Sequence, residues 1–181
     1  NVLDLPKTIL AHCIHLNDEE RKLLKNSEAW IVLNIESNIK NNVGNFSSAR
    51  LGENIMFGTD GMHSDMLRSA KAVYFNSLRI DKTAPEKIYE RLRNVSHYLY
   101  QNNLDGDGEN NLVVLDYTSP TDLNQDNFLS HFIYGIESKH IQHVISNGKL
   151  IVKDRQLTTV NESDMLEFSM EMGNKLWKKL S

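Results

Sequence analysis

The stretch NIMFGTDGMH, residues 54–63, runs from a short apolar segment into an acidic residue. Ile55–Phe57 has the composition of a buried strand, and Asp60 follows it closely. A carboxylate at a buried strand end is costly unless a positive group lies opposite it. We therefore expect such a group near Asp60, with a simple turn before Gly61 as the alternative.

Two units of the same kind precede this stretch. The apolar run at residues 8–14 is followed by a helix signal at Asn17, and the run at residues 29–35 ends in the polar tail Glu36–Asn38. A further helix opens after the quoted stretch, at Ser64. Continuous apolar strands that alternate with helices are typical of a parallel sheet in an α/β protein.

The pattern changes at NNLDGDGENN, residues 102–111, which predicts a boundary. Beyond it, residues 112–117 predict a strand. Residues 143–152 predict a hairpin, because Asn147–Gly148 is a strong two-residue turn signal.

Two helices complete the prediction. Thr83–Glu86 reads as a capping box that opens one of them. The last begins at about Ser163, and its apolar stripe predicts packing in the core, as does Trp30. We therefore divide the chain into residues 1–102, 103–160 and 161–181.

Composition narrows the function. The chain has 181 residues and a formal net charge of -4, without a basic stripe, which argues against nucleic acid and membrane surfaces as partners. Its single cysteine, Cys13, indicates a reducing compartment, and we expect the cytoplasm. No run approaches the roughly 20 apolar residues of a membrane span.

Polar side chains follow all three predicted strands of the first part. They are His12, then Asn34, Glu36 and Asn38, then Asp60. Ligands bind at this edge in α/β sheets, and catalytic groups gather there in (β/α) barrels. Because histidine can move protons or bind metal beside a carboxylate, the pattern suggests metal-assisted hydrolysis.

Five segments of the chain resemble the metal-dependent amidohydrolases. Within them the resemblance is to the deaminase and chlorohydrolase branch, and most closely to the SsnA aminohydrolases. The segments are ILAHCIHLNDEERKLL (9–24), NIESN (34–38), NIMFGTDGMHSDMLRSA (54–70), LVVLDYTSPTDL (112–123) and HVISNGKLIVKDRQL (143–157).

The resemblance implies a fold and an activity. Residues 1–102 would be the C-terminal part of a (β/α)8 TIM-like barrel. A small β module that contributes strands to a composite β-sandwich would follow, and then a closing helix. The parent protein would be a hydrolase of non-peptide C–N bonds that deaminates a purine-like heterocycle. It would use one divalent metal, zinc or iron, and act on a small molecule. Exposed strand edges of a partial barrel and of the β module would favour self-association, so we also expect a homo-oligomer.

The resemblance also assigns residues. Asp60 would bind the metal and take a proton from the attacking water, and His12 would orient that water or the tetrahedral intermediate. Asn38 would lie near substrate, although Ile35 stands where relatives have proline. His15 and His63 follow strand ends and are further candidates for substrate contacts.

Two motifs of this family do not occur in the sequence: a His-x-His pair and a His-x-x-Glu pair. The chain would therefore carry only part of an active site, as the C-terminal portion of a larger enzyme, and be inactive alone. A start at Asn1 rather than methionine agrees with that expectation. The alternative is a noncatalytic fragment or partner module that assembles with another polypeptide.

Other patterns are weaker. Asn103–Gly108 resembles the start of a calcium loop, but the twelfth position is Val114 instead of glutamate. His140 and His143 are expected on opposite faces of a strand, as are His12 and Cys13. A nucleotide-binding domain would need a glycine-rich phosphate loop, which the sequence lacks.

Overall fold

The computed structural model describes residues 2–106, 108 and 110–181. It divides into two compact units, the first formed by Asn1–Asp107 with Tyr117–Ser138 and the second by Gly108–Asp116 with Lys139–Ser181. Residues 117–138 thus belong with the first unit, whereas the sequence placed them in the β module. Asp107 and Glu109 of the predicted boundary lie outside the described residues.

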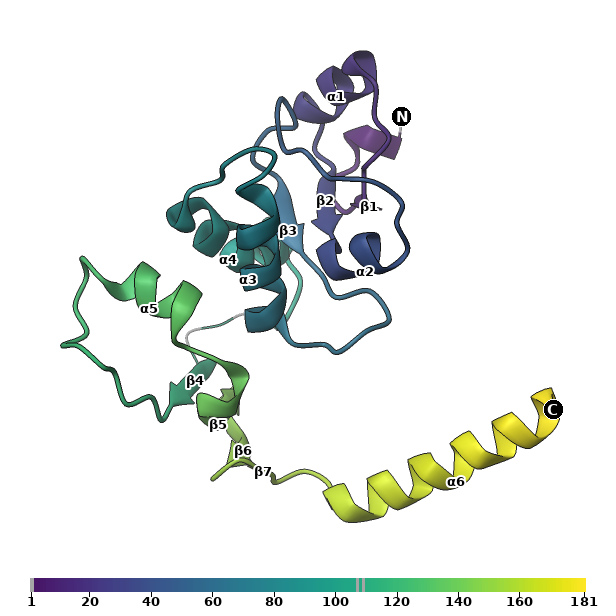
Figure 1. The fold of residues 1–181 in the computed structure, drawn as a ribbon, viewed down its shortest axis with the longest axis vertical. Helices are drawn as coiled ribbons and strands as arrows, with labels where there is room; N and C mark the ends of the chain where they lie inside the picture. The colour runs from purple at the N-terminus through teal and green to yellow at the C-terminus, as the bar shows by residue number, and fades with distance from the viewer. Residues whose placement is uncertain (1, 107, 109) are drawn as a thin grey trace. The chain divides into compact units, whose positions relative to one another are not determined.

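The first unit is built on a three-stranded parallel sheet (Figure 1). Its strands are β1 (Ile9–Ala11), β2 (Trp30–Leu33) and β3 (Ile55–Phe57), in that order across the sheet. The parallel sheet predicted from the sequence is therefore confirmed. Every residue of β3 is buried, as expected for a strand between crossover helices.

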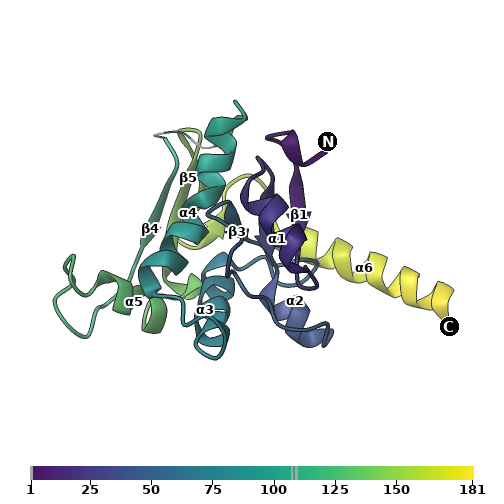
Figure 2. The same cartoon turned by 90° about the horizontal axis from the view of Figure 1, so that it is seen from above.

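Helices surround these strands. The helices of the first unit are η1 (Val2–Asp4), α1 (Asp18–Lys25), α2 (Ile35–Lys40), α3 (Met66–Ser77), α4 (Pro85–Gln101) and α5 (Phe128–Tyr134). Figures 1 and 2 show α3 and α4 beside each other against β3. The centre of the core holds large aliphatic side chains that are exposed by 2% or less, among them Ile31, Leu33, Ile55, Ile88 and Ile133.

Helix starts follow the sequence signals in part. Asn17 caps α1 in a capping box with Glu20, as expected. The predicted capping box at Thr83–Glu86 is wrong. Helix α4 begins at Pro85 and its N-cap is Ala84, whose methyl side chain cannot accept a hydrogen bond. Asp65 caps α3 in place of Ser64.

Helix α2 was not predicted. The sequence read its first residues as the polar tail of a strand, whereas they begin a helix directly after Asn34. Ile35 is buried at 3% exposure, so the chain gains apolar burial by turning at once instead of extending. This turn decides the geometry of the site described below.

The second unit is an antiparallel sheet followed by a long helix. The elements are β4 (Leu112–Leu115), β5 (Ile141–Ser146), β6 (Lys149–Lys153), β7 (Gln156–Leu157) and α6 (Glu162–Leu180), with η2 (Ser138–His140) leading into β5. Asn147 and Gly148 have φ of 49° and 73° and join β5 to β6, so the hairpin prediction is confirmed.

Helix α6 departs from its prediction. None of its residues is buried, and Phe168 and Trp177 are 60% and 69% exposed. The expectation that its apolar stripe packs in the core is wrong for this structure, whereas Trp30 is buried as expected. Among the described helices, none is long and apolar enough to cross a bilayer.

Candidate active site

The carboxyl ends of β1, β2 and β3 lie at one edge of the parallel sheet. Ala11 pairs with Val32, and Leu33 pairs with Phe57. The chain leaves each strand at this edge, so His12 comes from the connection after β1 and Asp60 from the connection after β3, on either side of β2. The structure thus brings together the two residues that the sequence predicted as catalytic.

His12 follows β1 in a left-handed conformation, with φ of 69°. Its backbone N–H donates to the carbonyl of Val32, 2.9 Å away, which fixes the turn. Its Nδ1 lies 2.7 Å from Oδ1 of Asn38, an atom that can only accept. The ring proton therefore sits on Nδ1, and Nε2 faces Asp60 Oδ2 at 3.8 Å.

Asp60 lies past the end of β3 and also has a positive φ, of 54°. Its side chain is 45% exposed, so the carboxylate is not at a buried position as the sequence suggested. Two donors hold it in place. The hydroxyl of Ser37 donates to Oδ2 at 2.6 Å, and the N–H of Gly61 donates to Oδ1 at 2.7 Å.

These contacts set the charge of the site. The pKa of Asp60 is lowered, first by the Ser37 hydroxyl and then by the Gly61 N–H, with smaller contributions from His12 and Lys40. The carboxylate is therefore ionised at neutral pH. His12 and Lys40, the positive groups near Asp60, contribute less to its lowered pKa than the hydrogen-bond donors Ser37 and Gly61 do.

Helix α2 positions both predicted catalytic side chains. Ser37 holds Asp60, and its neighbour Asn38, exposed by only 1%, holds His12. From the sequence Ser37 had no assigned role, and its place in the segment NIESN (34–38) was the only signal for it. Asn38 was predicted near substrate; that contact stays a prediction beside the contact with His12.

Gly58 allows the strand ends to approach one another. A Cβ at this position would collide with the side chains of Asn34 and Val32. A larger residue would therefore push the chain that leads from β3 to Asp60 away from the end of β2.

The remaining predicted histidines differ in their surroundings. His15 is exposed, and its ring lies beside Gly44. His63 is mostly buried, and it binds the carboxylate of Glu36, which also binds Arg68. Substrate contacts by either histidine stay predictions.

Cys13 is no partner for His12 in a nucleophilic pair. Strand alternation does not apply, because β1 ends at Ala11 and Cys13 has φ of 49°. Its side chain packs against the apolar core, and burial raises the pKa of the thiol. A raised thiol pKa makes a poorer nucleophile at neutral pH.

The side chains present fit part of a metal site. A catalytic zinc usually takes three protein ligands and one water. Asp60 and His12 could supply two of them, and the described residues contain no group of three or more His, Cys, Asp or Glu that could hold a metal ion. Further ligands would have to come from outside these residues.

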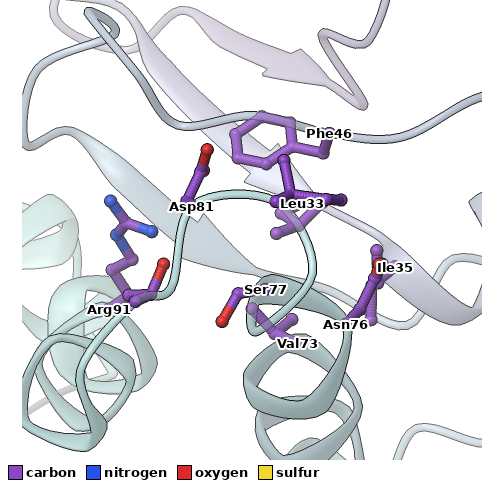
Figure 3. A pocket seen from close by; sticks show the side chains of 10 residues that line it. Leu33, Ile35, Phe46, Val73, Asn76, Ser77, Asp81 and Arg91 are labelled. Atoms are coloured by element: carbon purple, nitrogen blue, oxygen red, sulfur yellow. The ribbon is translucent and has the colours of Figure 1, made fainter.

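A small cavity elsewhere in the first unit is not a substrate site (Figure 3). Its volume of about 10 Å³ admits roughly one water molecule. Arg91 and Asp81 line it with Phe46 and Val73. Burial lowers the pKa of Arg91, whose Nε has no partner in the described part of the chain.

An open groove lies beside α2 and α3, and neither His12 nor Asp60 lines it. It has a volume of about 620 Å³ and is lined by residues of α2, α3 and the loop after Asp60, among them Lys40, Met62, Phe75 and Arg79. This volume lies in the range of small-molecule sites, and the walls combine apolar and cationic side chains.

Several curated proteins with similar sequences carry the names of deaminases. The 5'-deoxyadenosine deaminase of Methanopyrus kandleri is 30% identical over 184 residues, 93% of this chain and 42% of that protein. The enzyme of the same name from Methanococcus vannielii is 29% identical over 94% of this chain and 44% of its own length. The 5-methylthioadenosine/S-adenosylhomocysteine deaminase of Syntrophobacter fumaroxidans is 27% identical over 90% and 41%.

The resemblance to the deaminase branch is confirmed. This chain spans less than half the length of the relatives it matches. The narrower likeness to the SsnA group stays a prediction, and no family model matches the chain.

Solved structures agree on the fold. An adenosine deaminase from Xanthomonas campestris with bound zinc matches with a TM-score of 0.81 and 19% identity, over 97% of this chain and 44% of that one. Atrazine chlorohydrolase from Arthrobacter aurescens, with zinc, matches with a TM-score of 0.71 and 14% identity, over 90% and 40%. The chain therefore has the α/β fold of the matched parts of amidohydrolases.

Proposed function

We propose that the protein that carries this chain is a metal-dependent aminohydrolase that deaminates an adenine-bearing nucleoside or a related purine-like ring. The observation that carries the proposal is the pair His12 and Asp60, held 3.8 Å apart at the carboxyl edge of a parallel sheet. The names of the relatives, deaminases of 5'-deoxyadenosine and 5-methylthioadenosine, support the substrate class.

In the reaction, water adds to the ring carbon that bears the amino group, and ammonia leaves. Asp60, which is ionised at neutral pH, would accept a proton from the attacking water. His12 would direct Nε2 toward the same oxygen, because Asn38 occupies Nδ1. Ser37 keeps Asp60 oriented while the proton moves.

A divalent metal, zinc or iron, would be held in part by Asp60, with His12 beside it. When bound, the metal would lower the pKa of water at this position. The zinc in two of the matched structures supports a metal of this kind.

The proposed fold extends the observed sheet. We propose that β1, β2 and β3 are strands of a (β/α)8 barrel and that the second unit is the small β module of a composite sandwich. Support comes from the parallel order of the strands and the match to amidohydrolase structures. The domain boundaries after residues 102 and 160, self-association and a cytoplasmic location stay predictions.

A noncatalytic partner module is the less favoured reading. The curated relatives carry the names of enzymes, which supports catalysis by the parent protein. The second reading predicts that Asp60 has no catalytic role, and the experiment below separates the two.

The test is turnover by the complete natural protein with Asp60→Asn. Ammonia release would be measured with 5'-deoxyadenosine, 5-methylthioadenosine and adenosine, together with metal content. Loss of a proton acceptor lowers kcat by about 10²- to 10⁴-fold. Asp18→Asn is the matched control, because this aspartate is 74% exposed and pairs only with Arg50 among the described residues. Equal turnover by Asp60→Asn and wild type would overturn the proposal.

A further inference from the structure

A second carboxylate, Glu36, lies one residue before Ser37 on α2 and is not used by the proposed reaction. Its Oε2 lies 2.5 Å from Nε2 of His63. Its Oε1 accepts from Nε of Arg68 at 2.9 Å and lies 2.8 Å from Nη2. The side chains of Glu36 and His63 are 19% and 17% exposed, so this cluster is largely shielded from solvent.

The contacts of His63 indicate its tautomer. Its Nδ1 accepts the backbone N–H of Asp65 at 3.0 Å, so the ring proton lies on Nε2 and points at Glu36. Both ring nitrogens are thus occupied by the protein. His63 is placed to connect segments of the chain, and it has no free nitrogen to offer a ligand in this geometry.

The segments that it connects are α2 and the loop that carries Asp60. This loop runs from the end of β3 at Phe57 to the start of α3 at Met66. Asp60 and Ser64 both have left-handed φ, of 54° and 55°, which costs free energy for residues other than glycine. Such a conformation persists only where surrounding contacts hold it.

Helix α2 holds this loop at two points. Ser37 donates to Asp60 near the start of the loop, and Glu36 binds His63 near its end. The N–H of Gly61 can then reach Oδ1 of Asp60 at 2.7 Å. Arg68 offsets the charge of Glu36, so the second attachment leaves no buried unpaired carboxylate.

We propose that Glu36 is a positioning residue for Asp60, acting through His63 and neutralised by Arg68. Its role in turnover rests on the proposed function, whereas its role in the geometry of Asp60 does not. The Gly61 amide reports that geometry directly, because it donates to the carboxylate.

The experiment uses Glu36→Gln in the complete natural protein, with Glu171→Gln as the control. Glu171 pairs with Lys175 at 2.6 Å on the exposed face of α6. Two-dimensional NMR would compare the Gly61 amide shift and its exchange with solvent. Zinc affinity would be measured against a chelator, and kcat and KM with the nucleosides named above.

We expect Glu36→Gln to move the Gly61 amide resonance and speed its exchange. Zinc affinity and kcat should each fall about 10- to 100-fold, the usual cost of losing a residue that supports a metal ligand. KM should change by less than about threefold, because substrate contacts remain. The control should match wild type in every measurement.

Arg68→Gln serves if Glu36→Gln fails to fold. The Arg68 side chain is 58% exposed, so its loss leaves the core intact. We expect the same changes, each below about tenfold. An unchanged Gly61 amide in the folded variants overturns the inference. If the wild-type protein binds no zinc and releases no ammonia, the proposed function is overturned instead. In that case the shift and exchange of the Gly61 amide in Glu36→Gln still decide whether Glu36 positions Asp60.

Discussion

Strands β3 and β4 have similar sequences and opposite environments. β3 reads IMF, and all three residues are exposed by 7% or less. β4 reads LVVL, and its residues are 37% to 57% exposed. An apolar run therefore shows which residues can be buried, and it does not show what buries them.

The difference follows from how each sheet is connected. The parallel strands of the first unit are joined by helices, and the crossover helices bring apolar faces onto the sheet. In the second unit, tight turns join β5 to β6 and β6 to β7, and these turns supply no covering layer. The connection from β4 to β5 runs through residues 117–138, which pack as part of the first unit. No described residue of the second unit is buried. Three paired comparisons test this contrast.

The largest effect is expected from core truncation. Ile55 is fully buried, so Ile55→Ala should lower the free energy of unfolding by about 3 kcal/mol through lost burial and a cavity. Val113 is 57% exposed, and Val113→Ala should cost less than about 0.5 kcal/mol. Urea unfolding measures both. Equal costs would mean that another surface covers β4 in solution, and the contrast would fail.

A smaller effect is expected at the helix caps. Asn17 accepts from the N–H of Glu20 at 2.9 Å, and Asn17→Ala should cost about 1 kcal/mol. Asn161 caps α6 in the same way, but α6 buries no residue. Asn161→Ala should therefore fray α6, seen as faster amide exchange, with little change in the unfolding midpoint. A shift of that midpoint as large as for Asn17→Ala would show that α6 folds together with the core.

The smallest effect is expected in thiol reactivity. Burial raises the pKa of Cys13, so at pH 8 less of it is thiolate than for an exposed thiol. Compared with Ser169→Cys on the exposed face of α6, Cys13 should react a few-fold more slowly with iodoacetamide.

The raised pKa of Cys13 also makes the stability of the protein depend on pH. Burial favours the neutral form of the Cys13 thiol in the folded state. The contribution of this thiol to the free energy of unfolding is therefore fully present below the unfolded pKa of about 8.5. It is lost as the pH rises through the higher pKa of the folded state. For the thiol comparison, peptide mapping by mass spectrometry separates the iodoacetamide reaction of Cys13 from that of the introduced thiol, and the protein unfolded in urea is the reference. Equal iodoacetamide reaction rates of the two thiols in the folded protein would contradict the burial of Cys13.

The site shows the same division between sequence and structure. His12 and Asp60 could be named from the sequence, because polar residues after parallel strands converge at one edge. Ser37, Glu36 and the tautomer of His12 could not, since they depend on α2 beginning at Ile35. The polar end of a strand and a short polar helix have similar compositions. In the structure these residues form a helix whose first residue, Ile35, is buried.

By itself the sequence determined the parallel sheet, the Asn147–Gly148 hairpin, the cap at Asn17 and the resemblance to deaminases. These features depend on local periodicity, on turn chemistry or on a motif of fixed spacing. Tertiary structure alone decided that α6 and β4 are exposed, that α2 holds the side chains of both His12 and Asp60, and that Glu36 reaches His63. Those outcomes depend on which surfaces meet, and contacts between segments distant in sequence leave no periodic signal in it.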